Sequence, residues 1–230
     1  MLLFFYKNSF IWYNYIILEM DGMFIGKYNK SACVTYLGTL SSLIGMFLAF
    51  KQRIRTAIIC LVISGVCDMF DGKVARKQKD RTEEDKNYGV EIDSLSDTIC
   101  FVVFPIVIAL SMGMNRWYNA IIYAIYGLAG IIRLAYFNIT TSNTVAIKNY
   151  TGLPVTSSAI IFPAVFLLKF VLDKGCFDIL ATVVMGLVGF LFISKVKISK
   201  PKGKVLYVFL AAAIIVIIFM VSTFFWKARI

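Results

Sequence analysis

The chain has 230 residues, of which 60% are hydrophobic and 16% are charged. Soluble domains usually contain about 45–50% apolar and roughly 25% charged residues, so the composition excludes a soluble globular enzyme and a disordered chain. The net charge is +11 and histidine is absent, which excludes Ser-His-Asp triads and histidine-ligated metals and leaves carboxylates, Lys, Tyr or Cys for acid–base or metal chemistry.

Residues 1–32 are predicted to form a separate N-terminal segment that is amphipathic, juxtamembrane or an extra span. Its first part is apolar but is interrupted by polar residues such as Lys7 and Asn14. This pattern fits an interfacial helix or a further transmembrane helix. A third reading is that translation starts at Met20 or Met23. No small-residue cleavage site of the kind that ends a signal peptide follows.

Runs of about 18–20 apolar residues recur from residue 33 onward, and each is long enough to cross a bilayer core of roughly 30 Å. They predict that residues 33–230 form one all-α, polytopic membrane helix bundle with six to eight transmembrane helices and a best count of seven. The predicted spans are 33–50, 55–70, 94–113, 117–138, 155–172, 176–194 and 205–226. The second continues as a polar extension to about Lys79.

Acidic residues are concentrated between the second and third spans, where nine of the 13 lie between Asp68 and Asp97. Asp68 and Asp71 are three apart and Asp93 and Asp97 are four apart, so on helices each pair shares a face. Either pair alone would be ordinary on a solvated surface. Two helices meeting at these faces would gather four carboxylates, which need a cation to offset their repulsion and desolvation. Mg²⁺ and Mn²⁺ suit such oxygen ligands, and paired metals recur in phosphoryl chemistry.

Three residues beside the first aspartate pair suit a phosphate-bearing ligand. Gly72 and Ala75 have small side chains, or none, where a ligand could approach the backbone. Arg76 offers a planar fork of donors that can bind a phosphate bidentately.

The whole motif resembles the signature of the CDP-alcohol phosphotransferases, integral membrane enzymes of phospholipid synthesis. The shared pattern is Asp-x2-Asp-Gly-x2-Ala-Arg followed by Gly-x3-Asp-x3-Asp. Its eight positions are Asp68, Asp71, Gly72, Ala75, Arg76, Gly89, Asp93 and Asp97. One departure is that twelve residues, rather than the usual eight, separate Arg76 from Gly89. Four added residues are about one helical turn, so an extended helix or a loop would absorb them.

The resemblance implies a metal-dependent transfer from a CDP-linked lipid. The four aspartates would hold two divalent cations, Mg²⁺ or Mn²⁺, against the pyrophosphate, and Asp97 would also serve as a shared ligand or as the catalytic base. The nucleotide part would be bound by Asp68, Gly72, Ala75 and Arg76. Because similar enzymes are commonly homodimers, a homodimer is expected, with membrane lipids as further partners.

Two later segments bear on the acceptor alcohol. Residues 133–138 and 152–159 resemble stretches of bacterial and archaeal membrane-type phosphatidylserine synthases. Serine carries a carboxylate, so its pocket needs a cation or hydrogen-bond donors. The candidate acceptor-binding residues are Arg133, Asn138, Thr156 and Ser157. Structural roles stay open for them, since Arg133 also suits a topological anchor or a salt bridge.

The leading expectation is therefore transfer of a phosphatidyl group from CDP-diacylglycerol to L-serine, giving phosphatidylserine and CMP. Family members that use glycerol 3-phosphate, inositol or inositol phosphate are the alternatives. A cation transporter with intramembrane carboxylates is a remote alternative from another class. The sequence leaves open the acyl-chain preference, the choice between Mg²⁺ and Mn²⁺, and the oligomeric state.

Loop charges predict the orientation. With residue 30 in the cytoplasm, 16 of the 24 Lys and Arg fall inside and 8 outside, as the positive-inside rule requires. The trio Lys51, Arg53 and Arg55 opposes this assignment. We expect an integral protein of a prokaryotic plasma membrane with the aspartates facing the cytoplasm. Topology and anionic lipid headgroups then account for the basic excess, and no nucleic-acid partner is expected.

Overall fold

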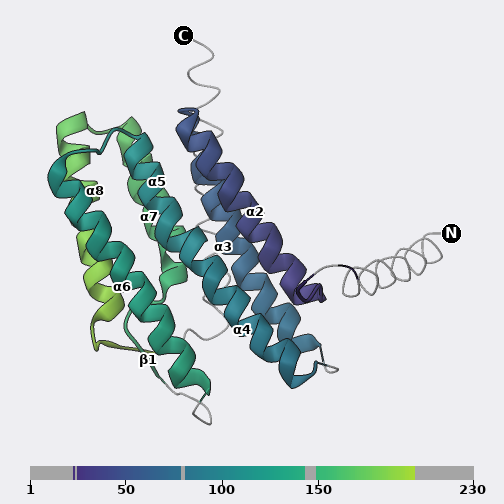
Figure 1. Ribbon diagram of the computed structural model, residues 1–230. Coiled ribbons are helices and arrows are strands. Elements are labelled where there is room, and N and C mark those ends of the chain that lie inside the picture. The colour runs from purple at the N-terminus through teal and green to yellow at the C-terminus, as the bar shows by residue number, and fades with distance from the viewer. Residues whose placement is uncertain (1–22, 24, 79–80, 143–148, 200–230) are drawn as a thin grey trace.

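The computed structural model describes residues 23, 25–78, 81–142 and 149–199 (Figure 1). The α-helices are α2 (Lys30–Phe50), α3 (Ile54–Lys77), α4 (Glu83–Asp97), α5 (Phe104–Ser111), α6 (Trp117–Ser142), α7 (Ser158–Leu167) and α8 (Lys174–Ile193). A π-helical segment, η1 (Thr98–Val103), joins α4 to α5, and short 3-10 turns η2 (Val155–Ser157) and η3 (Leu168–Phe170) flank α7. Two three-residue strands, β1 (Asn149–Thr151) and β2 (Lys197–Ser199), pair antiparallel.

The predicted class, an all-α polytopic membrane bundle, is confirmed apart from the small strand pair, which the sequence did not predict. Six predicted spans fall on α2, α3, the α4–α5 rod, α6, α7 and α8. The N-terminal segment 1–22 and the predicted span 205–226 lie outside the described residues, so the count of seven stays a prediction. By length and composition, four described helices could cross a membrane, namely Lys30–Phe50, Glu83–Ser111, Trp117–Thr140 and Lys174–Ile193.

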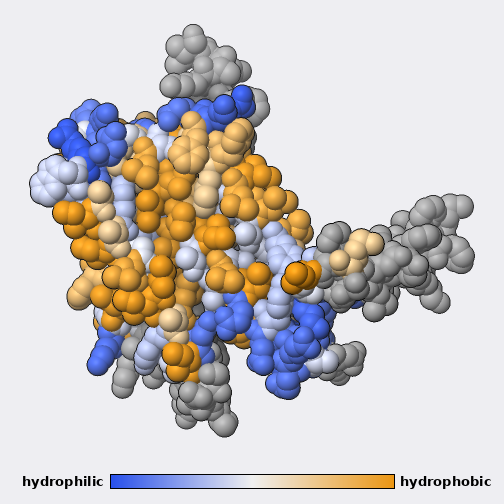
Figure 2. Space-filling view, in the orientation of Figure 1, coloured by the Kyte–Doolittle hydropathy of each residue, from blue (hydrophilic) through white to orange (hydrophobic). Residues whose placement is uncertain are grey.

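The surface of the bundle matches a bilayer. Figure 2 shows hydrophobic side chains gathered in a broad band over the middle of the visible face, with hydrophilic side chains at both ends. Large apolar residues such as Phe47, Leu128 and Phe190 are exposed within the described helices. An apolar surface of this extent is typical of contact with lipid rather than water.

The close approach of α2 to α3 and the α4–α5 rod depends on small residues. The buried face of α2 is lined by Ser31, Ala32, Thr35, Gly38, Ser42, Gly45 and Ala49. A Cβ atom on Gly45 would lie 2.7 Å from the Cβ of Cys60 in α3, so no larger residue fits there. Small residues let membrane helices pack backbone to backbone. This packing places the polar side chains of α2 close to the aspartates of α3.

The rod that carries the second aspartate pair changes its helical type directly after Asp97. Residues 98–103 are π-helical, and Pro105 follows in the first turn of α5. The Tyr126 hydroxyl in α6 donates to the Phe101 carbonyl over 2.6 Å, which satisfies a carbonyl inside this segment. Such π segments often occur at functional sites. The changed twist begins at the residue after the last predicted metal ligand.

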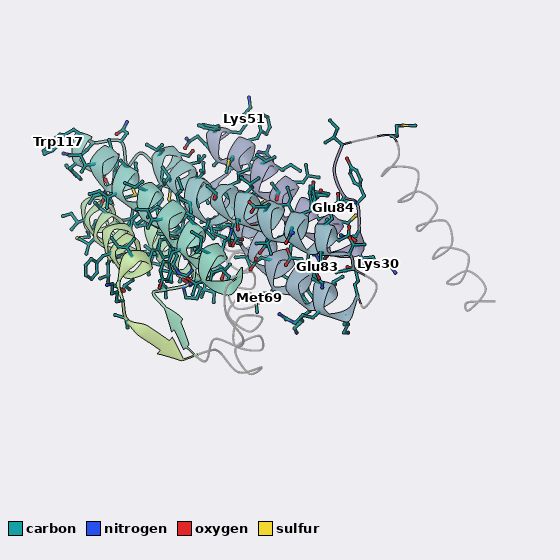
Figure 3. The ribbon with its side chains drawn as sticks, turned by 60° about the horizontal axis from the view of Figure 1, so that its bottom comes forward. Lys30, Lys51, Met69, Glu83, Glu84 and Trp117 are labelled. Carbon is teal, nitrogen blue, oxygen red and sulfur yellow. The ribbon has the colours of Figure 1, made fainter. Side chains whose placement is uncertain are left out.

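The helices alternate in direction along the chain, with the α4–α5 rod counted as one, so the two ends of the bundle differ. We call the end where α3, α6 and α8 finish and α4 begins the aspartate end (Figure 1). In Figure 3, Lys30, Glu83 and Glu84 lie toward this end, while Lys51 and Trp117 lie toward the opposite end. The segments of the acidic motif and those proposed for the acceptor therefore share one end of the molecule.

Candidate active site

The two aspartate pairs meet near the aspartate end. Asp68 and Asp71 lie in the last part of α3, and Asp93 and Asp97 lie in the second half of α4. All four line one small cavity, which we call the aspartate cavity. Carboxylate oxygens of Asp68, Asp71 and Asp93 lie within 4.8 Å of one another. The structure thus brings together the side chains that the i,i+3 and i,i+4 spacings predicted to share two helix faces.

Among the residues that the structure describes, no cation forms an ion pair with this cluster. Asp71 and Asp97 are only 6% and 8% exposed, and Asp68 and Asp93 are half-buried. The ion pairs in the described part of the chain join Lys27 and Lys86 to acids of the first turn of α4, and none includes these four aspartates. Buried carboxylates without a counter-ion are costly. An all-oxygen set of this kind fits a hard divalent cation such as Mg²⁺ or Mn²⁺.

Thr35 is a neighbour of the aspartates that does not belong to the sequence motif. Its hydroxyl donates to Oδ2 of Asp71 over 2.7 Å, and both side chains are buried. A hydrogen bond of this kind fixes the direction of a ligating carboxylate. The only sequence signal was the place of Thr35 in a row of small residues at helical spacing along α2.

A second, larger cavity of about 330 Å³ adjoins the aspartates, and we call it the glycine cavity. Its lining includes Asp71, Gly72, Ala75, Gly89 and Asp93. Two of the residues predicted to bind the nucleotide, Gly72 and Ala75, are therefore placed on one wall beside the carboxylates.

Arg76, a further predicted nucleotide-binding residue, lies differently. It is exposed and does not line the glycine cavity. Its Nη1 atom lies 3.8 Å from the position that a Cβ of Gly72 would occupy. The side chain therefore runs beside Gly72 at the rim of the site. Its predicted contact with a phosphate stays a prediction.

Of the twelve residues between Arg76 and Gly89, the last six belong to α4. The helix begins at Glu83, six residues before Gly89, with Thr82 as its N-cap. Thr82 and Asp85 form a reciprocal capping box, in which the Asp85 N–H donates to the Thr82 hydroxyl and the Thr82 N–H donates to the Asp85 carboxylate, both over 3.1 Å. Acids in the first turn also favour the helix through its dipole. The side chains of Asp93 and Asp97 face α3.

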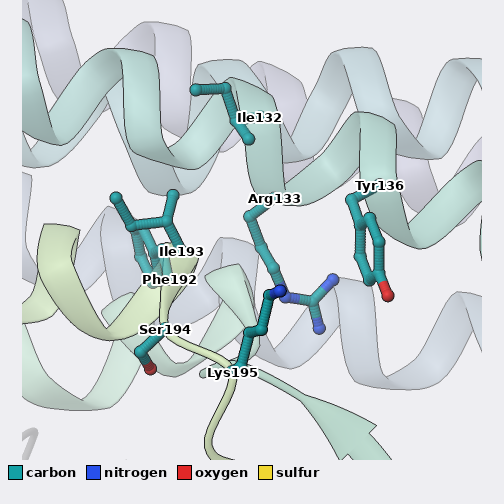
Figure 4. A pocket seen from close by; sticks show the side chains of 7 residues that line it. All are labelled: Ile132, Arg133, Tyr136, Phe192, Ile193, Ser194 and Lys195. Carbon is teal, nitrogen blue, oxygen red and sulfur yellow. The ribbon is translucent and has the colours of Figure 1, made fainter.

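The candidate acceptor residues divide into separate environments. Arg133 is buried and lines a cavity of about 430 Å³, the Arg133 cavity, between the ends of α6 and α8 (Figure 4). Tyr136, Ser194 and Lys195 line the same cavity. The guanidinium of Arg133 lies over the ring of Phe137, 5.0 Å from its centroid. In the sequence, Lys195 counts only among the loop charges that predict the orientation, so its position beside Arg133 was not predicted.

The other three acceptor candidates do not line the Arg133 cavity. Asn138 donates through Nδ2 to the Ser94 hydroxyl over 2.7 Å, next to Asp93 in sequence. Ser157 donates its hydroxyl to the Pro154 carbonyl, within its own turn. Thr156 is half-buried in the same turn. The four residues share the aspartate end but not one pocket.

Comparisons with known proteins agree with the motif. The model of the CDP-alcohol phosphatidyltransferase family matches residues 29–229. The chain is 31% identical over 198 residues to a CDP-diacylglycerol–serine O-phosphatidyltransferase of Helicobacter pylori, covering 84% of this chain and 79% of the relative. It is 31% identical over 188 residues to the Methanocaldococcus jannaschii protein of the same name, covering 80% and 81%. It is 29% identical over 171 residues to the archaetidylserine synthase of Methanothermobacter thermautotrophicus, covering 74% and 69%.

The match extends over most of the chain and includes both helices that carry the acidic motif. Together with four carboxylates gathered in one cavity and a glycine-lined cavity beside them, it identifies the chain as a member of the CDP-alcohol phosphatidyltransferase family.

Proposed function

We propose that this protein transfers the phosphatidyl group of CDP-diacylglycerol to the hydroxyl of L-serine, forming phosphatidylserine and releasing CMP. The observation that carries the proposal is the meeting of Asp68, Asp71, Asp93 and Asp97 in one cavity beside the glycine cavity. Three relatives with coverage of more than two thirds are named for serine transfer or archaetidylserine synthesis, which supports serine as the acceptor.

The reaction can be assigned to groups of this chain. Asp97, the most enclosed position of the second pair, would accept the proton of the serine hydroxyl as a general base. The serine oxygen then forms a bond to the lipid-side phosphorus, and the bond from that phosphorus to the bridging oxygen of the diphosphate breaks as CMP leaves. Asp68, Asp71 and Asp93, with Asp97 as a shared ligand, would hold two divalent cations, Mg²⁺ or Mn²⁺. When bound, such cations neutralise charge on the transferred and leaving phosphates.

Gly72 and Ala75 would form the wall against which the nucleotide lies, because their size leaves space in the glycine cavity. Asp68, which lines the adjoining aspartate cavity, and Arg76, at the rim, complete the proposed nucleotide-binding set. The serine carboxylate would bind Arg133, with Lys195 as a second cation in the same cavity. Asn138, Thr156 and Ser157 stay proposed acceptor residues at the same end of the bundle.

The membrane location and orientation of the protein are part of the proposal as well. The protein would lie in a prokaryotic plasma membrane as a homodimer, with the aspartate end facing the cytoplasm. The orientation is supported by the basic side chains that cluster at this end, including Lys27, Lys30, Arg81, Lys86 and Lys195. CDP-diacylglycerol would enter from the surrounding lipid, since its chains match the apolar band of the bundle.

A phosphorylated acceptor is the second candidate, because the Arg133 cavity holds two cations rather than one. An acceptor panel separates the two. Purified protein with CDP-diacylglycerol and Mn²⁺ or Mg²⁺ is supplied with radiolabelled serine, glycerol 3-phosphate, inositol or inositol phosphate, and labelled lipid is measured. We expect label in lipid with serine. Product with another acceptor alone would overturn the serine assignment and leave the family intact.

The role of Arg133 predicts a selective kinetic effect. Arg133→Ala should raise the KM for serine by about tenfold or more, because it removes a charge-assisted hydrogen bond to the carboxylate. The KM for CDP-diacylglycerol should change little. Arg116→Ala, which removes an exposed cation at the opposite end of the bundle, is the matched control. A larger change in the KM for the CDP-lipid than for serine would remove Arg133 from the acceptor pocket.

A further inference from the structure

The glycine cavity contains a cation that the eight-residue motif does not include. Arg81 lies just before α4 and lines this cavity together with Gly72, Gly89 and Asp93. It comes from the stretch between Arg76 and Gly89, which has twelve residues where the family pattern usually has eight. A second cation, Lys86, also lines the cavity, but its ammonium is paired with Glu83 at 2.6 Å.

The guanidinium of Arg81 is held in place by the first turn of α4. Its Nη2 donates to the Asp85 carbonyl over 3.0 Å. Asp85 is itself fixed, since it forms the capping box with Thr82. The side chain is half-buried, so it is not an arginine extended freely into solvent. The position of the planar fork is therefore set before any ligand arrives.

Gly89 makes room for this arrangement. A Cβ atom on Gly89 would lie 2.5 Å from Nη2 of Arg81, closer than side chains pack. Any other residue at this position would force the guanidinium away from α4. In this chain the glycine of the motif therefore has a definite steric role, which is to leave space for the Arg81 guanidinium beside α4.

One donor of this arginine is left without an acceptor. The Nε of Arg81 is buried and has no hydrogen-bond partner among the described residues. No carboxylate of the described part of the chain forms an ion pair with Arg81. An arginine is always charged, and a buried donor without a partner is costly. Because Arg81 lines the glycine cavity and forms no ion pair with a described carboxylate, its guanidinium suits an oxygen acceptor brought by a ligand.

We propose that Arg81 binds an oxygen of the CMP part of the CDP-linked donor. The inference rests on the proposed function for its donor class. The same cavity reaches Asp71 and Asp93, so a ligand whose diphosphate lies at the carboxylates would extend its nucleotide along Gly72 and Gly89 toward Arg81. Arg81 is thus a nucleotide-binding residue contributed by the segment that departs from the family spacing.

The test is nucleotide binding by the purified full-length protein with Mn²⁺, measured by calorimetry for CMP and for cytidine. Arg81→Gln should weaken CMP binding about tenfold or more and raise the KM for CDP-diacylglycerol with little change in that for serine. Arg81→Lys keeps the charge but loses the planar fork, and should also bind CMP more weakly. Lys77→Gln, an exposed cation outside the cavity, is the matched control and should bind as the wild type does.

A double variant tests the link to Gly89. Gly89→Ala should weaken CMP binding through displacement of Arg81, so adding it to Arg81→Gln should cost little more than the worse single change. A loss with CMP but not with cytidine would assign the contact to the phosphate, and a loss with both would assign it to the base or ribose. Unchanged CMP affinity in both folded Arg81 variants would overturn the role of Arg81 alone. A wild-type protein that binds no cytidine nucleotide would overturn the donor class as well.

Discussion

Asp97→Asn is expected to lower kcat by about 10³-fold or more, because it removes the proposed general base and a shared ligand of the metal site. Asn keeps the size and polarity of Asp, so the helix should be retained. The carboxylate is buried in a cavity with three others, and no ion pair in the described part of the chain includes it. Its removal relieves repulsion, so the metal-free variant should be at least as heat-stable as the wild type.

The control for this variant is Glu91→Gln, which makes the same change of charge on the same helix. Glu91 is exposed and does not line either cavity near the aspartates. It should keep wild-type turnover. Gel filtration and thermal unfolding in detergent report whether each variant is folded. Near-normal turnover by a folded Asp97→Asn protein would remove Asp97 both as base and as an essential ligand.

Asp71→Asn is expected to abolish turnover together with tight Mn²⁺ binding. Asn can still accept the hydrogen bond from Thr35, so the variant removes charge while the geometry is kept. Thr35→Val makes the complementary change, since it leaves the carboxylate but removes the group that orients it. Loss of such an outer partner costs about 10–100-fold in metal affinity, less than the loss of a ligand.

Mn²⁺ titration followed by electron paramagnetic resonance measures this order directly. The expected ranking of affinity is wild type, then Thr35→Val, then Asp71→Asn. Glu83→Gln, which changes an exposed acid of the α4 first turn, should match the wild type. Wild-type Mn²⁺ affinity in Asp71→Asn would contradict the assignment of the aspartate cavity as a metal site.

Several features of the molecule could be predicted because they depend on local pattern. The apolar runs predicted six of the helices, and the spacings within each aspartate pair predicted a shared face for Asp68 with Asp71 and for Asp93 with Asp97. Their meeting in one cavity follows once α3 and α4 are adjacent and antiparallel. A membrane helix must form its backbone hydrogen bonds internally, so its length and polarity can be predicted from a single sequence.

Other features depend on contacts between distant segments and could not be predicted from the sequence. Thr35 lies 36 residues before its partner Asp71, and nothing in the sequence distinguishes it from other small residues of α2. The strand pair joins residues on either side of α7 and α8. Arg81 belongs to no motif, and the cavity beside it forms only when α4 begins after its N-cap Thr82 and packs near Gly72.

The residues of the acceptor site likewise depend on contacts between distant segments. Arg133, Asn138, Thr156 and Ser157 were grouped because their segments resemble those of similar enzymes, yet only Arg133 lines the cavity between α6 and α8. Its neighbour there, Lys195, comes from the segment just after α8 and carried no motif. Which side chains meet between α6 and the end of α8 depends on packing, which a linear pattern does not encode.

Transfer to serine at the aspartate cavity is tested by a two-product assay with purified protein, CDP-diacylglycerol, serine and Mn²⁺ or Mg²⁺. We expect CMP and phosphatidylserine in equal amounts, with neither product formed when serine, the metal or the Asp97 carboxylate is removed. CMP release without incorporation of serine, or transfer that persists in chelator, would contradict this expectation.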